Sequence, residues 1–294
     1  GTLPKPADLR SRPAAFHLQK RRMTMHANQI GLFTLPKPGM HNLEGIDCAK
    51  ALGLTAFEPF GTADFDDDTY ARRMRAHADE MGVTLPCLSV VADLYHDESG
   101  RERERLIRMA RAAAEMGCGL LHHTLLPGLS PRAAYPTPAE AIPVVAARAR
   151  EVYDAAERLG VRCVYEDQGY VFNGIQPFLA FLNALDRPAG VVLDVGNICF
   201  AGEDAEAFAE AVKDRIAHVH LKDFALLSAP APKAFALPSG AFAQPVVLGH
   251  GSVNVRGALA TLKRISYTGR LMLEHSGPME EQIACIQTLQ TWLA

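Results

Sequence analysis

The chain has 294 residues, and its 30 Lys and Arg against 33 Asp and Glu give a formal net charge of −3 at pH 7. This balance offers no basic excess to bind a nucleic acid backbone or an anionic membrane, and no stretch approaches the roughly 20 apolar residues of a membrane span. Hydrophobic residues make up 48% of the chain. That is enough for a large core. The charge balance favours a small-molecule partner.

Residues 1–22 differ from the rest of the chain. They hold six basic residues and one acidic residue, and they lack the apolar middle of a secretory signal. We interpret 1–22 as a disordered tag or extension and expect 23–294 to form a single domain. Six cysteines lie in apolar stretches, without any C-x-x-C pair: Cys48, Cys87, Cys118, Cys163, Cys199 and Cys285. This usage favours buried thiols in a reducing compartment, so we expect a cytoplasmic protein.

From about residue 28, short apolar runs alternate with amphipathic segments. Eight runs are expected to be strands, at 29–35, 55–60, 84–92, 119–126, 162–167, 190–196, 217–223 and 270–276. Helical patterns are expected at 43–53, 67–82, 101–117, 139–160, 175–185, 204–214, 255–265 and 279–293. Continuously apolar runs are typical of parallel strands buried on both faces. Eight such units predict the α/β class and a (β/α)8 TIM barrel. A doubly wound open sheet is the alternative, but no glycine-rich phosphate turn follows the first run.

Residues 224–248 form the one long stretch without a helix or strand pattern. The stretch follows the seventh run, on the side of the barrel where active sites lie. A loop of this length is usually functional or disordered. The sequence leaves its role open between a lid and a subunit contact.

Polar residues that can bind a metal end four successive runs. Glu166 ends the fifth, Asp194 the sixth, His220 the seventh and Glu274 the eighth. A barrel brings these strand ends together at its mouth. Taken singly, each residue has an ordinary interpretation as a cap, a salt-bridge partner or a core histidine. The three carboxylates together would repel one another and be costly to bury, however, and a divalent cation resolves that conflict. We expect Mn²⁺ first, with Mg²⁺, Co²⁺ or Zn²⁺ as alternatives.

Five further polar residues are candidates for substrate binding: Glu58, His123, Gln168, Asn197 and Lys222. Glu58 ends the second run and could instead bond a neighbouring strand, and the two amides could instead act as structural caps. One of the two histidines that end the fourth run must face the mouth, and we assign this position to His123.

The stretch HVHLKD, residues 218–223, is unusually polar for a core strand. Strand alternation points Lys222 to the same side as His220, towards a substrate. The same alternation places His218 one layer deeper, as support for a metal site. Asp223 points the other way and is expected to anchor the loop that follows.

Several motifs resemble the xylose isomerase-like barrel superfamily. They are YEDQG (165–169), LDVGN (193–197), HVHLKD (218–223), LGHGSVN (248–254), LMLEHSGP (271–278) and, more loosely, LEGIDCAKALGLTAFEPF (43–60). The family groups sugar isomerases and epimerases, inosose and dehydroshikimate dehydratases, and endonuclease IV. The resemblance implies that Glu166, Asp194, His220 and Glu274 bind one divalent metal, and that the two glutamates exchange a proton beside a carbonyl through an enediolate. Many members are dimers or tetramers, so a homo-oligomer is compatible with it.

The resemblance implies an enzyme of carbohydrate metabolism, a metal-dependent isomerase or epimerase of a ketose or related polyol. A metal-dependent dehydratase (lyase) of a keto-cyclitol or keto-acid, such as inosose or dehydroshikimate, is the alternative. An endonuclease IV-like DNA repair enzyme is remote. That enzyme has a histidine three residues after the strand-six aspartate, where this chain has Asn197, a poor zinc ligand. A non-catalytic sugar-binding protein is a fourth hypothesis, and the intact set of metal-ligand residues argues against it.

Overall fold

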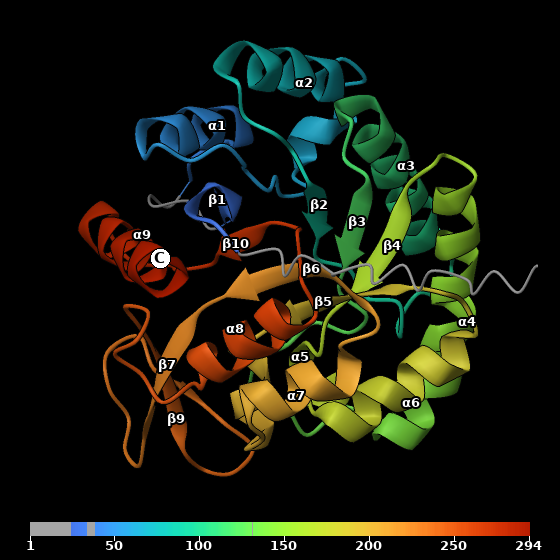
Figure 1. Ribbon diagram of the computed structural model, residues 1–294. Coiled ribbons are helices and arrows are strands. Elements are labelled where there is room, and N and C mark those ends of the chain that lie inside the picture. Colours follow the sequence, from blue (N-terminus) through green and yellow to red (C-terminus); the bar gives the residue numbers. More distant parts are fainter. Residues whose placement is uncertain (1–24, 34–38, 131) are drawn as a thin grey trace, which may run out of the picture.

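The computed structural model describes residues 25–33, 39–130 and 132–294. The extension predicted for 1–22 and the last two residues of the first predicted strand lie outside the described residues. Within this part of the chain, a seven-stranded parallel sheet curls around the centre of the molecule (Figure 1). In spatial order its strands are β1 (Ile30–Leu32), β10 (Leu271–Leu273), β6 (Ile216–Leu221), β5 (Gly190–Asp194), β4 (Arg162–Tyr165), β3 (Leu120–His123) and β2 (Cys87–Val90).

The second predicted strand, 55–60, closes the gap between β1 and β2 without becoming a regular strand. Isolated parallel bridges join Leu32 to Phe57 on one side and Phe60 to Ser89 on the other. The Glu58 N–H donates to the Leu32 carbonyl at 2.9 Å, and the Ser89 N–H donates to the Pro59 carbonyl at 3.0 Å. Proline lacks an N–H and cannot complete the ladder. The eight predicted segments therefore form the closed (β/α)8 barrel, with this segment as its irregular member.

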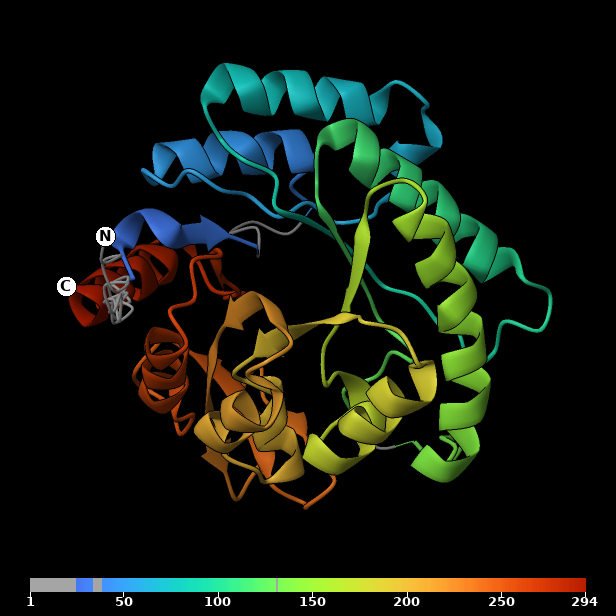
Figure 2. The ribbon, with the colours of Figure 1, turned by 45° about the vertical axis from the view of Figure 1, so that its right-hand side comes forward.

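Helices surround the sheet on the outside (Figure 2). They are α1 (Asn42–Ala51), α2 (Tyr70–Met81), α3 (Arg101–Met116), α4 (Pro138–Glu157), α6 (Ile175–Leu185), α7 (Ala205–Val212), α8 (Val255–Arg264) and α9 (Met279–Leu293), with the short α5 (Gly169–Phe172) after β4. Each predicted helix is found within three residues of its expected ends. Gly82 and Gly117 end α2 and α3 with φ of 65° and 79°, a left-handed cap that glycine adopts without steric cost.

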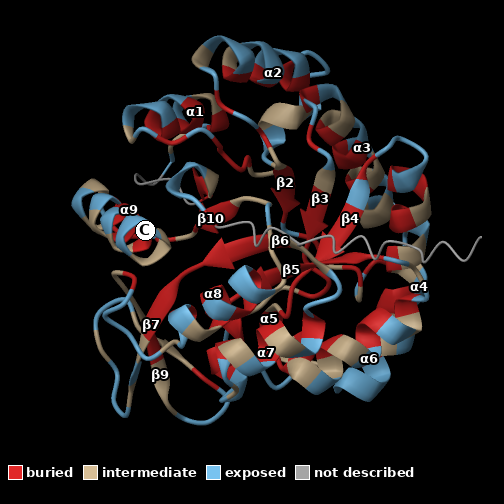
Figure 3. Cartoon of the chain, viewed as in Figure 1, coloured by how far each residue is buried: buried red, intermediate tan, exposed pale blue. Residues whose placement is uncertain are grey.

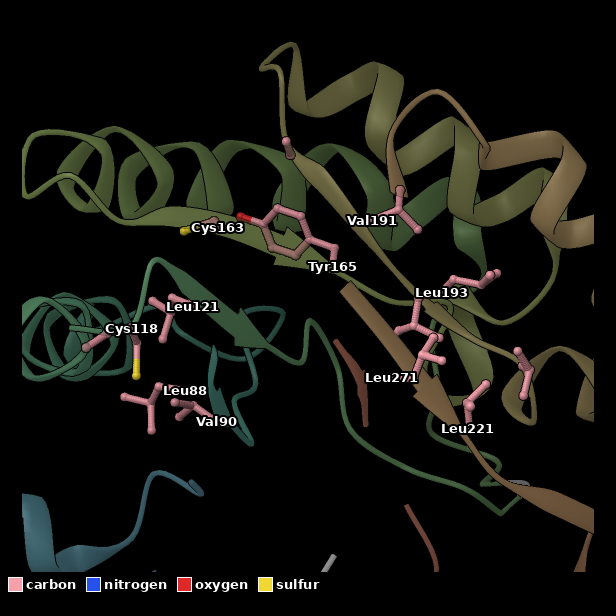
Figure 4. Close-up of a cluster of buried hydrophobic side chains, with 14 of the residues drawn as sticks. Leu88, Val90, Cys118, Leu121, Cys163, Tyr165, Val191, Leu193, Leu221 and Leu271 are labelled. Atoms are coloured by element: carbon pink, nitrogen blue, oxygen red, sulfur yellow. The ribbon is translucent and has the colours of Figure 1, made fainter. Parts of the chain in front are cut away.

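The strands are buried on both faces, which explains their uninterrupted apolar sequences (Figure 3). One large cluster fills the space between strands and helices; Leu121, Tyr165, Leu193 and Leu221 belong to it (Figure 4). The alternate residues of the same strands point the other way and form small separate clusters inside the barrel, such as Cys87, Val164 and Val192. This alternation decides which polar residues reach the interior.

Residues 224–248 contain a small antiparallel sheet that was not expected from the sequence. Its strands are β7 (Asp223–Leu227), β9 (Phe242–Val246) and β8 (Phe235–Ala236), in that spatial order. Phe224 packs with Phe200 and Phe235 in a separate apolar cluster. The buried Asp223 carboxylate accepts N–H bonds from Gly249 and Gly251, both at 2.9 Å, and so ties the following turn to β7.

All six cysteines are buried, and no disulfide joins any of them within the described residues. Within the same residues, every helix is too short or too polar to cross a membrane.

Candidate active site

Glu166, Asp194, His220 and Glu274 converge inside the barrel at the C-terminal ends of their strands. His220 lies at the centre of the group. Its Nδ1 is 3.4 Å from Glu166 Oε2, 3.5 Å from Glu274 Oε2 and 3.8 Å from Asp194 Oδ2. The structure thus brings together four residues that are separated by up to 108 positions in the sequence, as the barrel prediction required.

The hydrogen bonding of these side chains tests whether a divalent ion fits. Four buried atoms have no hydrogen-bond partner among the described residues: Glu166 Oε2, Asp194 Oδ2, His220 Nδ1 and Glu274 Oε2. The second oxygen of Asp194 accepts the N–H groups of Gly196 and Asn197, both at 2.8 Å, and that of Glu274 accepts Lys222 Nζ at 3.0 Å. Glu274 therefore has one oxygen held and one open, whereas Asp194 Oδ2 is paired with the Lys222 ammonium at 2.7 Å. Three oxygens and one imidazole nitrogen suit a divalent cation.

Lys222 lies among the carboxylates rather than beyond them. Its Nζ is 2.7 Å from Asp194 Oδ2, as an ion pair outside hydrogen-bond geometry, and it also bonds Glu274. Burial disfavours the ammonium, but the two carboxylates outweigh burial and raise the pKa of Lys222. A Cβ at Gly196 would lie 2.5 Å from Cγ of Lys222, so only glycine leaves room for its stem.

The carboxylates differ in acidity. Burial opposes ionisation of Glu166, but His122 and His220 outweigh it and hold the pKa of Glu166 well below its usual range. Burial raises the pKa of Glu274 to about 7, and Lys222 only partly offsets that effect. Burial, then Asp194 and Glu166, raise the pKa of the adjacent Asp167 well above its usual range.

Glu58 does not lie where a substrate could reach it, contrary to the prediction. Its side chain is fully buried and bonds Ser89 Oγ at 2.6 Å, His218 Nε2 at 2.6 Å and His220 Nε2 at 3.2 Å. Burial opposes its ionisation, yet the two imidazoles hold its pKa well below the usual range. His218 lies one layer below His220, as strand alternation predicted.

The assignment of His123 to the barrel interior is wrong. His123 faces the helices, where its Nδ1 bonds the Thr124 carbonyl at 3.0 Å and its ring meets Tyr165 edge-on at 5.0 Å. Burial lowers its pKa to about 4. His122 faces inward instead, with Nε2 3.4 Å from Glu166 Oε1 and Nδ1 2.8 Å from Ser89 Oγ. The sequence showed two adjacent histidines on a strand, but not which of the two side chains points into the barrel.

A cavity of about 280 Å³ opens above the carboxylates. Gln168, Asn197, Lys222 and Glu274 line it, whereas Glu166, Asp194 and His220 do not contribute to its lining. The remaining lining is mostly apolar; from β7, β9 and nearby segments it includes Phe60, Leu129, Phe200, Phe224, Phe235 and Pro245. Gln168 Oε1 and Asn197 Nδ2 are buried and have no hydrogen-bond partner among the described residues. The predicted position of 224–248 on the active-site side of the barrel agrees with the place of Phe224, Phe235 and Pro245 in this wall.

A closed parallel barrel with a carboxylate–histidine cluster beneath a cavity at its mouth is a (β/α)8 protein with a candidate metal centre. The model of the xylose isomerase-like TIM barrel family matches residues 46–292, so this chain belongs to that family. Among curated proteins, none matches this sequence significantly.

Solved structures share the fold at low sequence identity. A xylose isomerase-like TIM barrel protein from Mycobacterium smegmatis, in complex with magnesium, has a TM-score of 0.69 at 18% identity and covers 92% of this chain and 100% of its own. The probable 3-DHS dehydratase AsbF of Bacillus anthracis has a TM-score of 0.69 at 16% identity, covering 88% and 98%. The 3-keto-D-glucoside 4-epimerase YcjR of E. coli has a TM-score of 0.68 at 17% sequence identity. The match covers 90% of this chain and 98% of that protein's chain.

Proposed function

We propose that this protein is a divalent-metal-dependent isomerase or epimerase of a ketose or related sugar. One observation carries the proposal: ligand atoms of Glu166, Asp194 and His220 lie within 4.8 Å of one another, and Glu274 Oε2 lies 3.5 Å from His220 Nδ1, beneath a cavity of small-molecule size. Such an arrangement is costly for a protein that uses it only for stability. The similarity in fold to a 3-keto-D-glucoside 4-epimerase supports a sugar-like substrate.

The four residues would hold the ion, with Mn²⁺ as the first expectation; similarity to a magnesium complex supports a divalent ion of this kind. When bound, the ion would polarise a substrate carbonyl and acidify the neighbouring C–H. A water-poor site strengthens that effect, and the apolar wall of the cavity excludes water around the reacting carbon.

Glu166 and Glu274 would exchange the carbon-bound proton. Glu166 directly follows β4 and Glu274 directly follows β10, and in the sheet β5 and β6 lie between these two strands. The two side chains therefore approach a ligand from different directions. In the metal-free site the pKa of Glu166 lies well below its usual range and that of Glu274 is about 7. A bound divalent cation would favour the ionised form of both, so that either carboxylate could accept the proton. Gln168, Asn197 and Lys222 would bind the substrate hydroxyls.

A dehydratase is the second candidate, and the position of Lys222 favours it. Its ammonium lines the cavity beside Glu274, where it could bond a departing hydroxyl. A dehydratase is also among the proteins of similar fold. The substrate would then be a keto-cyclitol or keto-acid that forms a similar carbanion.

Incubation of the Mn²⁺-loaded protein with ketoses, keto-sugars, inosose and dehydroshikimate tests both candidates. Mass-neutral conversion identifies an isomerase or epimerase, while loss of water with a new ultraviolet chromophore identifies a dehydratase. Glu166→Gln should abolish turnover, whereas Glu210→Gln, on the outer helix α7, should not. Turnover that survives exhaustive chelation would contradict the proposal.

A further inference from the structure

Beneath the candidate metal site, a second cluster of polar side chains fills the barrel interior. Glu58 is its centre and accepts bonds from Ser89 Oγ, His218 Nε2 and His220 Nε2. All four side chains are at most 3% exposed. The His220 ring is also stacked on Phe33, with centroids 4.5 Å apart and planes 20° from parallel. His220 is therefore held on its face and at its lower nitrogen.

The direction of these bonds decides which nitrogen of His220 carries a proton. An ionised carboxylate only accepts hydrogen bonds, so the ring nitrogen that faces Glu58 must be N–H. A neutral imidazole carries one proton, and with Nε2 protonated its Nδ1 keeps the lone pair. Nδ1 is the atom that lies among Glu166, Asp194 and Glu274. Burial opposes protonation of the ring, but Glu58 and Glu166 outweigh it and raise the pKa of His220 well above its usual range. A cation that binds at Nδ1 would therefore replace a proton there, while the bond to Glu58 keeps Nε2 as the N–H.

The lower cluster also contains a set that could in principle bind a second ion. Glu58, Cys87 and His218 offer ligand atoms within 4.8 Å of one another. Unlike the upper set, their polar atoms have partners: Glu58 bonds His218 at 2.6 Å, and Cys87 Sγ contacts the Leu88 carbonyl at 3.8 Å. Burial, and to a lesser extent the charge of Glu58, raise the pKa of Cys87 well above its usual range, which opposes thiolate formation. The lower cluster is complete without a metal.

We propose that Glu58 is a positioning residue: it fixes His220 with Nδ1 turned to a single divalent cation, and the lower cluster supports that site rather than binding a second ion. This inference rests on the proposed metal-dependent function. Carboxylates that orient a ligating histidine in this way typically change metal affinity by about 10–100-fold when removed.

Glu58→Gln tests the proposal with little change of shape. The amide nitrogen of the glutamine would donate, which favours the His220 tautomer with its lone pair on Nε2 and its proton on Nδ1. Calorimetric titration with MnCl₂ alone should give one ion per wild-type chain, and the variant should bind about 10–100-fold more weakly. Glu210→Gln is the matched control: Glu210 bonds Thr261 Oγ1 at 2.7 Å between the outer helices α7 and α8, so its loss should leave the affinity unchanged.

A second measurement uses the wild type and does not depend on the folding of any variant. Long-range ¹H–¹⁵N spectra of the Zn²⁺-loaded protein should show His220 with a protonated Nε2 and a ligating Nδ1. Ligation through Nε2, two ions per chain, or unchanged Mn²⁺ affinity in Glu58→Gln would each overturn the inference while leaving the metal-dependent function intact. A wild type that binds no ion would overturn both.

Discussion

Replacing Glu274 by glutamine in the metal-free protein measures how much the buried, ionised carboxylate lowers the free energy of unfolding. Burial raises the pKa of Glu274 from 4.5 to about 7. Because the folded-state pKa exceeds the unfolded one, the carboxyl contributes stability that is fully present below pH 4.5 and is lost as the pH rises through about 7. At about 1.4 kcal/mol per pH unit, the ionised group costs about 3 kcal/mol at pH 8. Its side chain is 25% exposed, so water lowers this cost only in part.

Urea unfolding in chelator, followed by circular dichroism, measures this cost. Glu274→Gln should be more stable than the wild type by about 3 kcal/mol at pH 8, and the gain should shrink towards pH 5. Saturating Mn²⁺ should reverse the order, since only the wild type gains the full binding free energy. Glu210→Gln is the control with the opposite sign, because bonding to Thr261 lowers the pKa of Glu210. A Glu274→Gln protein that is less stable than the wild type in chelator at pH 8 would refute the reasoning.

Three further substitutions probe the surroundings of the site. Lys222→Met should destabilise the metal-free protein by about 3–5 kcal/mol, because Asp194 and Glu274 lose their buried cation. In urea titrations saturating Mn²⁺ should recover most of this loss, and an equal loss with and without metal would contradict the account. Gly196→Ala should cost about 1–3 kcal/mol through overpacking against the lysine stem, and an unshifted melting temperature would show that the stem can move aside. Asp223→Asn should lower the stability measured in thermal melts by about 2 kcal/mol, because the amide has fewer acceptors for the N–H groups around it. This loss of stability should be the same with and without Mn²⁺, and a metal-dependent loss would tie the residue to the site instead.

The sequence was sufficient to predict the barrel because each strand is buried on both faces and each helix on one. Those two patterns are local, and the late strands carry their polar residues at the ends, where a barrel gathers them. The segment 55–60 was predicted as a strand, yet Pro59 removes a ladder donor and leaves only isolated bridges. Residues 224–248 are rich in alanine and proline and show no alternation, so their antiparallel sheet was not predictable from a period.

The candidate site was harder to predict where it depended on which side chains of a strand point into the barrel. His122 and His123 are both buried, so the sequence contained no exposed neighbour from which to infer which one faces inward. Glu58 was placed at the end of the second predicted strand, but the depth of its side chain depends on the stagger between neighbouring segments, which a single sequence does not reveal. Its long-range bond to His218 joins residues 160 positions apart. Such contacts follow from barrel closure rather than from any local pattern.

Anomalous diffraction from a crystal soaked in MnCl₂ tests the central claim most directly. The account predicts one peak per chain, about 2.0–2.4 Å from Glu166 Oε2, Asp194 Oδ2, His220 Nδ1 and Glu274 Oε2. A peak among Glu58, Cys87 and His218, or no peak within the barrel, would contradict it.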